Sequence, residues 1–201
     1  MLSRDERRLR ILAASQRVFA SRPYDEIAID DLAAEAGMSK GLLYHYFPSK
    51  RDLYLETLRQ ELTTMSQITE SQHNLRSCLS ALLSHFEQAP GLTRMVFRGG
   101  IGSDAEVEAL LVAYRQHQLG LFFQRLNATT ADPLVRLGLA GWISFFQEVC
   151  LQWLEQRTIP REQILVLLEH NLRAILSSGE QQGQRAMGER DEAERWQEEG
   201  G

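Results

Sequence analysis

Apolar residues recur at the spacing of an α-helix along almost the whole chain. In the first such stretch, one helix face collects Ile11, Ala14, Ser15, Val18 and Phe19. No segment alternates apolar and polar residues in the way a β-strand does. We therefore expect an all-α protein without a sheet.

Capping residues and prolines mark where the expected helices begin and end. Pro23 ends the first helix, because the residue before a proline disfavours helical geometry. Gly37 suits the C-terminal cap of the second, while Ser39 and Ser49 suit the N-terminal caps of the third and fourth. The expected helices span about residues 4–21, 28–36, 39–47, 49–71, 74–88, 92–98, 104–127, 133–157 and 161–177.

This pattern divides the chain into three parts. Residues 1–48 form a three-helix unit, and residues 49–177 form a larger helical domain. Residues 178–201 hold many glycines and acids and few apolar side chains, so they cannot offset the entropy of ordering. We expect them to form a disordered acidic tail.

Composition excludes several classes of protein. Cys78 and Cys150 are isolated and the histidines lack metal-ligand spacing, so we expect neither a disulfide framework, a metal site nor a cofactor. The N-terminus is charged where a signal peptide is apolar, and no stretch approaches the ~20 consecutive apolar residues of a membrane span. A cytoplasmic protein without membrane contact is expected. The net charge of −5 argues against wholesale binding to a polyanion, although residues 1–50 hold eight Lys/Arg against seven Asp/Glu.

The segment SKGLLYHYFPSK, residues 39–50, carries the strongest functional signal. Two short helices, 28–36 and 39–47, flank a tight turn at Gly37, which is the spacing of a DNA-binding helix-turn-helix. Leu43 and Phe47 are spaced to bury on the core side. Tyr44, His45 and Tyr46 are then expected to point outward, where they can reach phosphates or base edges.

Other residues of this segment suit the same role. Gly41 costs a helix about 0.8–1.0 kcal/mol relative to alanine, which makes sense if backbone must approach DNA closely. Lys40 is a long cation on the reading helix. Lys50 lies at the start of the next helix, where its charge and the free N–H groups can grip a phosphate.

The stretch AIDDLAAEAGMSKGLLYHYFPSKRDLY, residues 28–54, resembles the signature of TetR-family transcriptional repressors. Residues 10–24 resemble that family's first helix. The resemblance implies a homodimer that binds a palindromic operator in double-stranded DNA. It also implies a C-terminal domain whose small-molecule effector controls DNA affinity. By motif position, Ser39, Lys40, Gly41, Leu42, Tyr44, His45, Tyr46 and Lys50 form the DNA-binding set.

Three residues depart from the family's pattern. Ala28 stands where Ser or Thr is common, so a helix cap and a possible phosphate contact are missing. Pro23 replaces a common glycine, while Tyr24 is retained. Leu42 replaces a small polar residue, which removes a hydrogen bond to a base but leaves an apolar contact to a thymine methyl.

The second domain supplies candidates for effector binding and for dimerisation. Helix 161–177 is apolar nearly all round, and a helix buried on two sides needs two partners, of which a second subunit is the simplest. The expected dimer contacts are Phe145, Ile164, Leu165, Leu168, Leu172 and Ile175; a thick monomer core is the alternative. The expected effector pocket, suited to a hydrophobic or aromatic molecule, is lined by Phe86, Met95, Phe97, Tyr114, His117, Trp142 and Phe146.

Two other classes of protein compete with a DNA-binding regulator. An all-α enzyme needs a nucleophile–base or carboxylate pair in a cleft, and the neighbours Ser84 and His85 have the wrong geometry for one. We therefore expect no enzymatic activity. A helical small-molecule-binding protein without DNA binding is the remaining alternative.

Overall fold

In the computed structural model, residues 3–99, 104–125 and 133–177 can be described, and all their regular structure is helical. The expected acidic tail at 178–201, residues 100–103 and residues 126–132 lie outside the described part of the chain. The helices are α1 (Arg4–Ser21), the 3₁₀ turn η1 (Tyr24–Glu26), α2 (Ile29–Ala36), α3 (Lys40–Tyr46), α4 (Lys50–Ser71), α5 (Leu75–Gln88), α6 (Pro90–Phe97), α7 (Ala105–Arg125), α8 (Pro133–Gln156) and an unlabelled helix over 161–177. The all-α expectation is confirmed.

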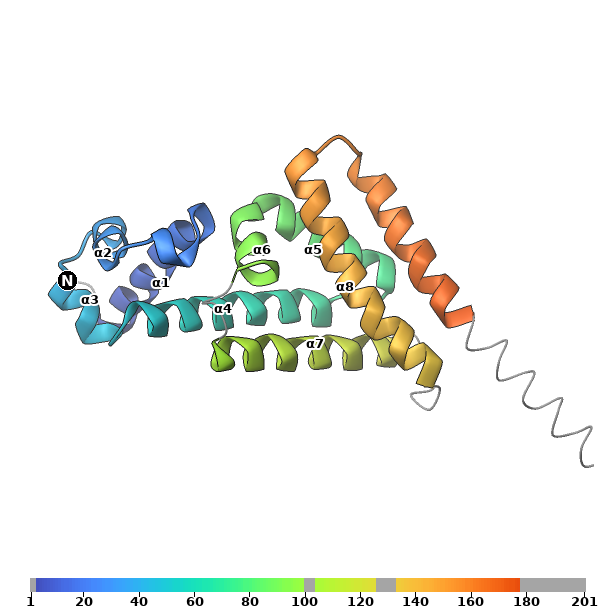
Figure 1. Ribbon diagram of the computed structural model, residues 1–201, viewed down its shortest axis with the longest axis horizontal. Coiled ribbons are helices and arrows are strands. Elements are labelled where there is room, and N and C mark those ends of the chain that lie inside the picture. Colours follow the sequence, from blue (N-terminus) through green and yellow to red (C-terminus); the bar gives the residue numbers. More distant parts are fainter. Residues whose placement is uncertain (1–2, 100–103, 126–132, 178–201) are drawn as a thin grey trace, which may run out of the picture.

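The molecule is elongated, with α1–α3 at one end and α8 with helix 161–177 at the other (Figure 1). The long helix α4 runs out of the small N-terminal unit and into the larger body. There α7 lies alongside it, while α5 and α6 cover it from the opposite side (Figure 1). Helix α4 therefore connects the two parts of the chain.

Local sequence explains where the helices begin. The Ser3 hydroxyl accepts a hydrogen bond from the Glu6 N–H, and the Glu6 carboxylate accepts one from the Ser3 N–H, which is a complete capping box. Ser49 caps α4 by accepting from the Asp52 N–H at 3.0 Å. At Ala28 no side-chain cap exists, as expected, yet the Asp31 carboxylate accepts the Ala28 N–H at 3.0 Å. Asp31 of α2 thus supplies one of the two hydrogen bonds of a capping box.

Leucines and aromatic side chains from both parts form one continuous core. Leu43 and Leu53 are fully buried beneath the N-terminal unit, and Leu79, Phe86 and Leu168 are fully buried in the body. Burial at this scale supplies the main driving force for folding, at about 25 cal/mol per Å² of apolar surface.

Helix α8 is long and apolar enough to cross a bilayer by length and composition alone. In the structure, however, Leu139, Trp142, Phe146 and Cys150 of this helix are buried against other helices of the chain. Packing inside the body therefore accounts for part of its apolar character.

Candidate nucleic-acid interface

The turn between α2 and α3 has the geometry that only glycine adopts easily. Gly37 lies in the left-handed region at φ +63°, ψ +39°. Its N–H donates to the Ala34 carbonyl, and the Met38 N–H donates to the Ala33 carbonyl, which together form a Schellman motif. This motif ends α2 sharply. Ser39 then begins α3, because its hydroxyl accepts the Leu42 N–H at 3.3 Å.

One face of α3 is open to solvent. Lys40, Gly41, Tyr44 and His45 are exposed there, and the Tyr44 side chain is 42% exposed. These residues fall at i, i+1, i+4 and i+5, so they share one side of the helix. The opposite side carries Leu43, which is completely buried and fastens α3 to the core.

Tyr46 corrects the expectation that all three neighbouring rings point outward. Its side chain is half-buried and packs against the core, with its ring edge-on to His45 at 5.6 Å between centroids. The reason is helical spacing: Tyr46 follows Leu43 by three residues, so the two lie on adjoining faces. Tyr44 and His45 therefore form the outward pair, and Tyr46 lies at its rim, as does the half-buried Leu42.

A glycine within α3 leaves its surface clear. A β-carbon placed on Gly41 would meet no atom of the described residues within 4 Å. Nothing inside the protein therefore requires glycine at this position. The bare backbone is free to approach another molecule closely.

Lys50 is already engaged within the protein. Its ammonium donates to the carbonyl oxygens of Tyr24 and Ile27, each at 2.8 Å, and lies 3.9 Å from the centroid of the Tyr24 ring. It thereby ties the start of α4 to the segment between α1 and α2. An ammonium has three donors, so these two hydrogen bonds leave one donor unused. Its phosphate contact stays a prediction.

Lys40 pairs with Asp30 at 3.1 Å, and both side chains are about half or more exposed, at 49% and 68%. An exposed pair of this kind contributes about 0–1 kcal/mol and is screened by salt. Lys40 can therefore leave Asp30 for a phosphate or base edge at little cost.

Sequence reasoning missed two arginines that brace this unit. The Arg8 guanidinium lies 5.3 Å from the centroid of the Phe47 ring and pairs with Glu56 at 2.7 Å. Arg51, one residue after Lys50, donates two hydrogen bonds to Asp104, at 2.6 and 2.9 Å. Arg8 lies three residues before the buried Ile11, and Arg51 directly follows Lys50 of the motif. No local pattern, however, identifies the distant residues with which these arginines pair.

The Arg51–Asp104 pair fixes the first turn of α4 to the start of α7. The Arg51 hydrogen bonds are the main cause that lowers the pKa of the Asp104 carboxyl to about 2, and the N–H groups of Val107 and Glu106 add to it. Glu106 accepts further bonds from Arg51 and Arg59. A small ionic network thus connects the recognition end with the body.

In the body, four of the expected effector-pocket residues form one ring cluster. The Phe86 ring lies 5.5 Å from Phe97 and 6.0 Å from Phe146, and Phe146 stacks on Trp142 at 5.4 Å. The Trp142 indole N–H donates to the Leu168 carbonyl at 3.3 Å. The rings are packed against one another, so an effector among them would have to separate them.

Of the other three pocket candidates, His117 and Met95 have contacts outside the ring cluster. His117 is half exposed and its Nε2 lies 2.9 Å from Glu70, away from the ring cluster. Burial raises the pKa of the Tyr114 hydroxyl. Met95 lines a separate cavity beside α1. The assignment of all seven residues to one effector site stays a prediction.

A buried acid beside the ring cluster was also missed. The Glu61 side chain is 2% exposed, and its carboxylate lies 2.6 Å from His85 Nε2. Glu61 occupies a core position of α4, where the sequence pattern favours an apolar residue. Only a three-dimensional partner such as His85 explains how this acid is tolerated.

The expected dimer residues are divided between core and surface. Ile164, Leu165, Leu168 and Leu172 are buried within the chain itself, while Phe145 and Ile175 are half-buried. Helix 161–177 packs closely on α8, because a β-carbon on Gly138 would lie 2.5 Å from Ile175 Cγ2. The large apolar side chains exposed on these two helices and the turn between them are Leu134, Leu137, Ile159, Val166 and Leu167.

Comparison with known proteins connects this geometry to a family. Residues 11–57, which include the whole helix-turn-helix, match the family model described as bacterial regulatory proteins, tetR family. The chain belongs to the TetR family of transcriptional regulators. It is similar to the transcriptional activator FasR of Mycolicibacterium smegmatis, with 31% identity over 54% of this chain and 53% of FasR. It is also similar to the regulator EthR of Mycobacterium tuberculosis, with 45% identity over 28% of this chain and 26% of EthR.

The matched segments span about half or less of these curated relatives. Solved structures extend the likeness to the body of this TetR-family chain. A tetR-family regulator from Streptomyces coelicolor superposes with a TM-score of 0.79 at 25% identity, over 89% of this chain and 83% of that one. The fold is also that of FadR from Bacillus subtilis, solved with stearoyl-CoA, with a TM-score of 0.64 at 18% identity over 84% and 97% of the two chains. Membership of this family supports the expectation that the chain is not an enzyme.

Proposed function

We propose that this TetR-family regulator is a repressor that binds a palindromic operator as a homodimer and leaves it when a small hydrophobic or aromatic effector binds. The observation that carries the DNA-binding part is the open face of α3. Lys40, Gly41, Tyr44 and His45 share it, and the buried Leu43 anchors it from behind.

The chemistry of that face suits a major groove. Lys40 and the ring nitrogens of His45 can hydrogen-bond to base edges, and Leu42 can contact a thymine methyl. Ser39, the Tyr44 and Tyr46 hydroxyls and the remaining donor of Lys50 would bind the phosphates that flank the groove. Gly41 lets the α3 backbone come close between them.

Dimerisation is proposed through α8 and helix 161–177. Since four of the expected contact residues are buried inside the chain, the exposed Val166 and Leu167 are the stronger candidates for the contact, flanked by Phe145 and Ile175. An exposed apolar patch of this kind is typical of a protein–protein interface.

Effector control would act through α4. In a helix-turn-helix dimer the two recognition helices must lie about 34–36 Å apart to reach successive major grooves. An effector in the body that favours another tilt of α4 changes that separation. A coupling of ~1–3 kcal/mol would weaken operator binding roughly 5–150-fold.

Repression of the regulated promoter is also part of the proposal. Among the relatives, FasR is named an activator and AcnR of Corynebacterium diphtheriae a repressor.

A binding experiment tests the DNA-binding part. The purified protein is titrated against duplex DNA from the region upstream of its own coding sequence, at several salt concentrations, by fluorescence anisotropy. We expect binding at two protomers per site with an affinity that falls steeply with salt, because phosphate contacts release counterions. Equal affinity for a scrambled duplex at every salt concentration would contradict sequence-specific operator binding.

A further inference from the structure

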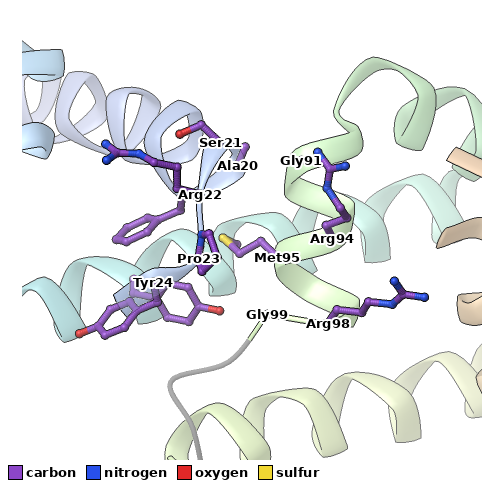
Figure 2. A pocket seen from close by; sticks show the side chains of 12 residues that line it. Ala20, Ser21, Arg22, Pro23, Tyr24, Gly91, Arg94, Met95, Arg98 and Gly99 are labelled. Atoms are coloured by element: carbon purple, nitrogen blue, oxygen red, sulfur yellow. The ribbon is translucent and has the colours of Figure 1, made fainter. Parts of the chain in front are cut away.

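A cavity of about 430 Å³ separates the N-terminal unit from the body. One wall is the end of α1 with the turn that follows it, and the other is α6, with Tyr54 of α4 also contributing (Figure 2). Its lining residues include Phe19, Pro23, Tyr54, Arg94 and Met95. The volume lies within the roughly 300–1,000 Å³ range of small-molecule sites.

The cavity adjoins the point where the two parts of the chain touch most closely. A β-carbon on Gly91 would lie 2.2 Å from the Ala20 carbonyl oxygen, so α1 and α6 meet there backbone to backbone. A second cavity of about 450 Å³, also lined by Ala20, Gly91 and Arg94, lies beside the same contact. Open space thus adjoins the contact between α1 and α6.

Three arginines line the first cavity, but two are committed to other partners. Arg22 bonds to Asp31 at 3.1 Å, and Arg98 bonds to Glu148 and Glu155 at 3.0 and 2.9 Å. In Figure 2 the Arg98 guanidinium extends away from Pro23, and the Arg22 guanidinium extends away from α6. Arg94 makes no ion pair or side-chain hydrogen bond with any described residue, and no acid lines the cavity. In Figure 2 the Arg94 side chain runs along α6 toward Gly91, so its uncompensated positive charge lies at the Gly91 end of the cavity.

One lining residue, Tyr54, has a buried hydroxyl without a partner among the described residues. Tyr54 is 2% exposed, and among the described residues its hydroxyl is the one buried side-chain polar atom that lacks a hydrogen bond. Leaving such a group unsatisfied costs about 1–3 kcal/mol. Burial raises the pKa of Tyr54 to about 12, so the hydroxyl stays protonated and can donate.

The rest of the lining is apolar. Phe19 contacts Tyr54 edge-to-face at 5.1 Å between centroids, which gives one aromatic side. Met95 and Pro23 approach each other across the space in Figure 2. A thioether and aromatic rings suit an apolar ligand body, and methionine adapts its shape readily. The single Arg94 guanidinium can pair with one anionic group of a ligand. A polyphosphate would carry negative charges that no side chain of the cavity pairs with.

We propose that this cavity binds a small amphipathic carboxylic acid, whose carboxylate pairs with Arg94 and whose apolar body fills the space beside Phe19 and Met95. A ligand oxygen near Tyr54 would accept its free hydroxyl hydrogen. The site is distinct from the ring cluster of Phe86, Phe97, Trp142 and Phe146.

Occupancy of this site would act on DNA binding, a consequence that rests on the proposed function. The ligand touches the end of α1 and α6 at once, beside the Ala20–Gly91 contact. Filling the space would favour one spacing of the two helices over others. The position of the N-terminal unit relative to the body would then depend on the ligand.

Calorimetry without DNA tests the binding site itself. The probes are 4-phenylbutyrate and its neutral amide, 4-phenylbutyramide, which differ in charge and have nearly the same size. We expect one phenylbutyrate per chain and at least tenfold weaker binding of the amide, because only the acid pairs with Arg94. Equal affinity for acid and amide, or no binding of the acid at millimolar concentration, would overturn the proposal.

Substitutions show which residues hold the probe. Arg94→Gln should weaken phenylbutyrate binding about tenfold, whereas Arg115→Gln on α7, which also has no ion pair with a described residue, should leave it unchanged. Tyr54→Phe should weaken it several-fold without loss of melting temperature, since it removes an unsatisfied hydroxyl. Arg94→Gln behaving like Arg115→Gln would rule out the charge pairing, and an unchanged affinity in Tyr54→Phe would rule out the hydroxyl's part.

Methionine-methyl NMR places the probe independently of any regulatory activity. Of the five methionines, Met95 lines the cavity and Met65 lies in the core of the body at 1% exposure. Phenylbutyrate should shift the Met95 methyl signal and leave Met65 in place. A shifted Met65 with an unmoved Met95 would place the probe in the core and overturn the assignment. Failure of operator binding in the anisotropy titration would leave these results standing.

Discussion

The carbonyl oxygen of Ala20 faces Gly91 so closely that a β-carbon on Gly91 would lie 2.2 Å from it and 2.7 Å from the Ala20 β-carbon. No side chain separates α1 from α6 at this point. The position of the N-terminal unit on the body is therefore set by backbone contact, and a methyl group is enough to disturb it.

Gly91→Ala should destabilise the protein, because the added methyl group would meet backbone atoms that cannot rotate away. Overpacking of this kind costs about 1–3 kcal/mol. Thermal unfolding should show a melting temperature several degrees lower. Gly120→Ala on α7 is the control, since no atom of residues 3–99, 104–125 or 133–177 lies within 4 Å of its added carbon. It should stabilise α7 by up to about 1 kcal/mol. Equal melting of the two variants would show that α1 and α6 can separate freely.

Gly41→Ala should separate folding from DNA binding. The added methyl group meets no atom in the part of the chain that the structure describes, so α3 should become more stable by about 0.8–1.0 kcal/mol. Operator affinity should nevertheless fall at least tenfold, because the methyl group would stand between the α3 backbone and the DNA. Anisotropy titrations and thermal melts measure the two effects. Undiminished affinity would mean that α3 does not approach DNA at Gly41.

Tyr44→Ala and Lys50→Ala should both weaken operator binding but should differ in melting temperature. Tyr44 is exposed, so its loss should weaken operator binding while melting stays unchanged. Lys50 holds two backbone carbonyls, so its loss should lower the melting temperature as well as the affinity. Lys50→Ala melting like the wild type would show that its two internal hydrogen bonds contribute nothing.

The Arg51–Asp104 pair should make stability depend on acid pH. The pKa of Asp104 is lowered in the folded state from its ordinary 3.8 to about 2, chiefly by Arg51. A depressed pKa gives stability that is complete above pH ~4 and is lost as the pH falls toward 2. Urea unfolding of the wild type and Asp104→Asn should therefore differ most at neutral pH and converge below pH 4. A difference that stays constant down to pH 2.5 would contradict this.

Val166→Glu should convert the proposed dimer into monomers, since it places a charge in an apolar contact. The control is Val112→Glu, which changes another exposed valine on α7. Light scattering after size exclusion measures the mass of each. Operator affinity should fall with the dimer in the first variant and remain in the second. A Val166→Glu dimer of unchanged mass would place the subunit contact on another surface.

Much of this fold follows from local sequence. Pro23 and Gly37 end their helices, Ser39 and Ser49 begin theirs, and the helical spacing of Leu43 and Phe47 identifies the buried side of α3. These features depend on neighbours a few residues away, so a sequence shows them directly. The exposed positions of Tyr44 and His45 follow from the same spacing.

The partners of several charged side chains could not be predicted, because they lie far away in the sequence. Lys50 bonds to carbonyls more than twenty residues earlier, and Arg51 bonds to Asp104 fifty-three residues later. No short pattern encodes such partners. Helix 161–177 reads as apolar on nearly every side, but only its packing on α8 shows that Leu168 and Leu172 face inward while Val166 and Leu167 face outward.

Helix α6 is short and is held at both ends: Gly91 meets α1, and Arg98 holds Glu148 and Glu155 of α8. Helix α6 therefore connects α1 to α8. Its contact with α8 includes the Arg98 ion pairs, which are exposed to solvent and weaken as ionic strength rises. Added salt would then weaken operator binding in two ways. It competes for the phosphates, and it weakens the Arg98 ion pairs that hold α6 on α8. A phosphate count taken from the salt slope of operator binding would exceed the number of phosphates the protein touches.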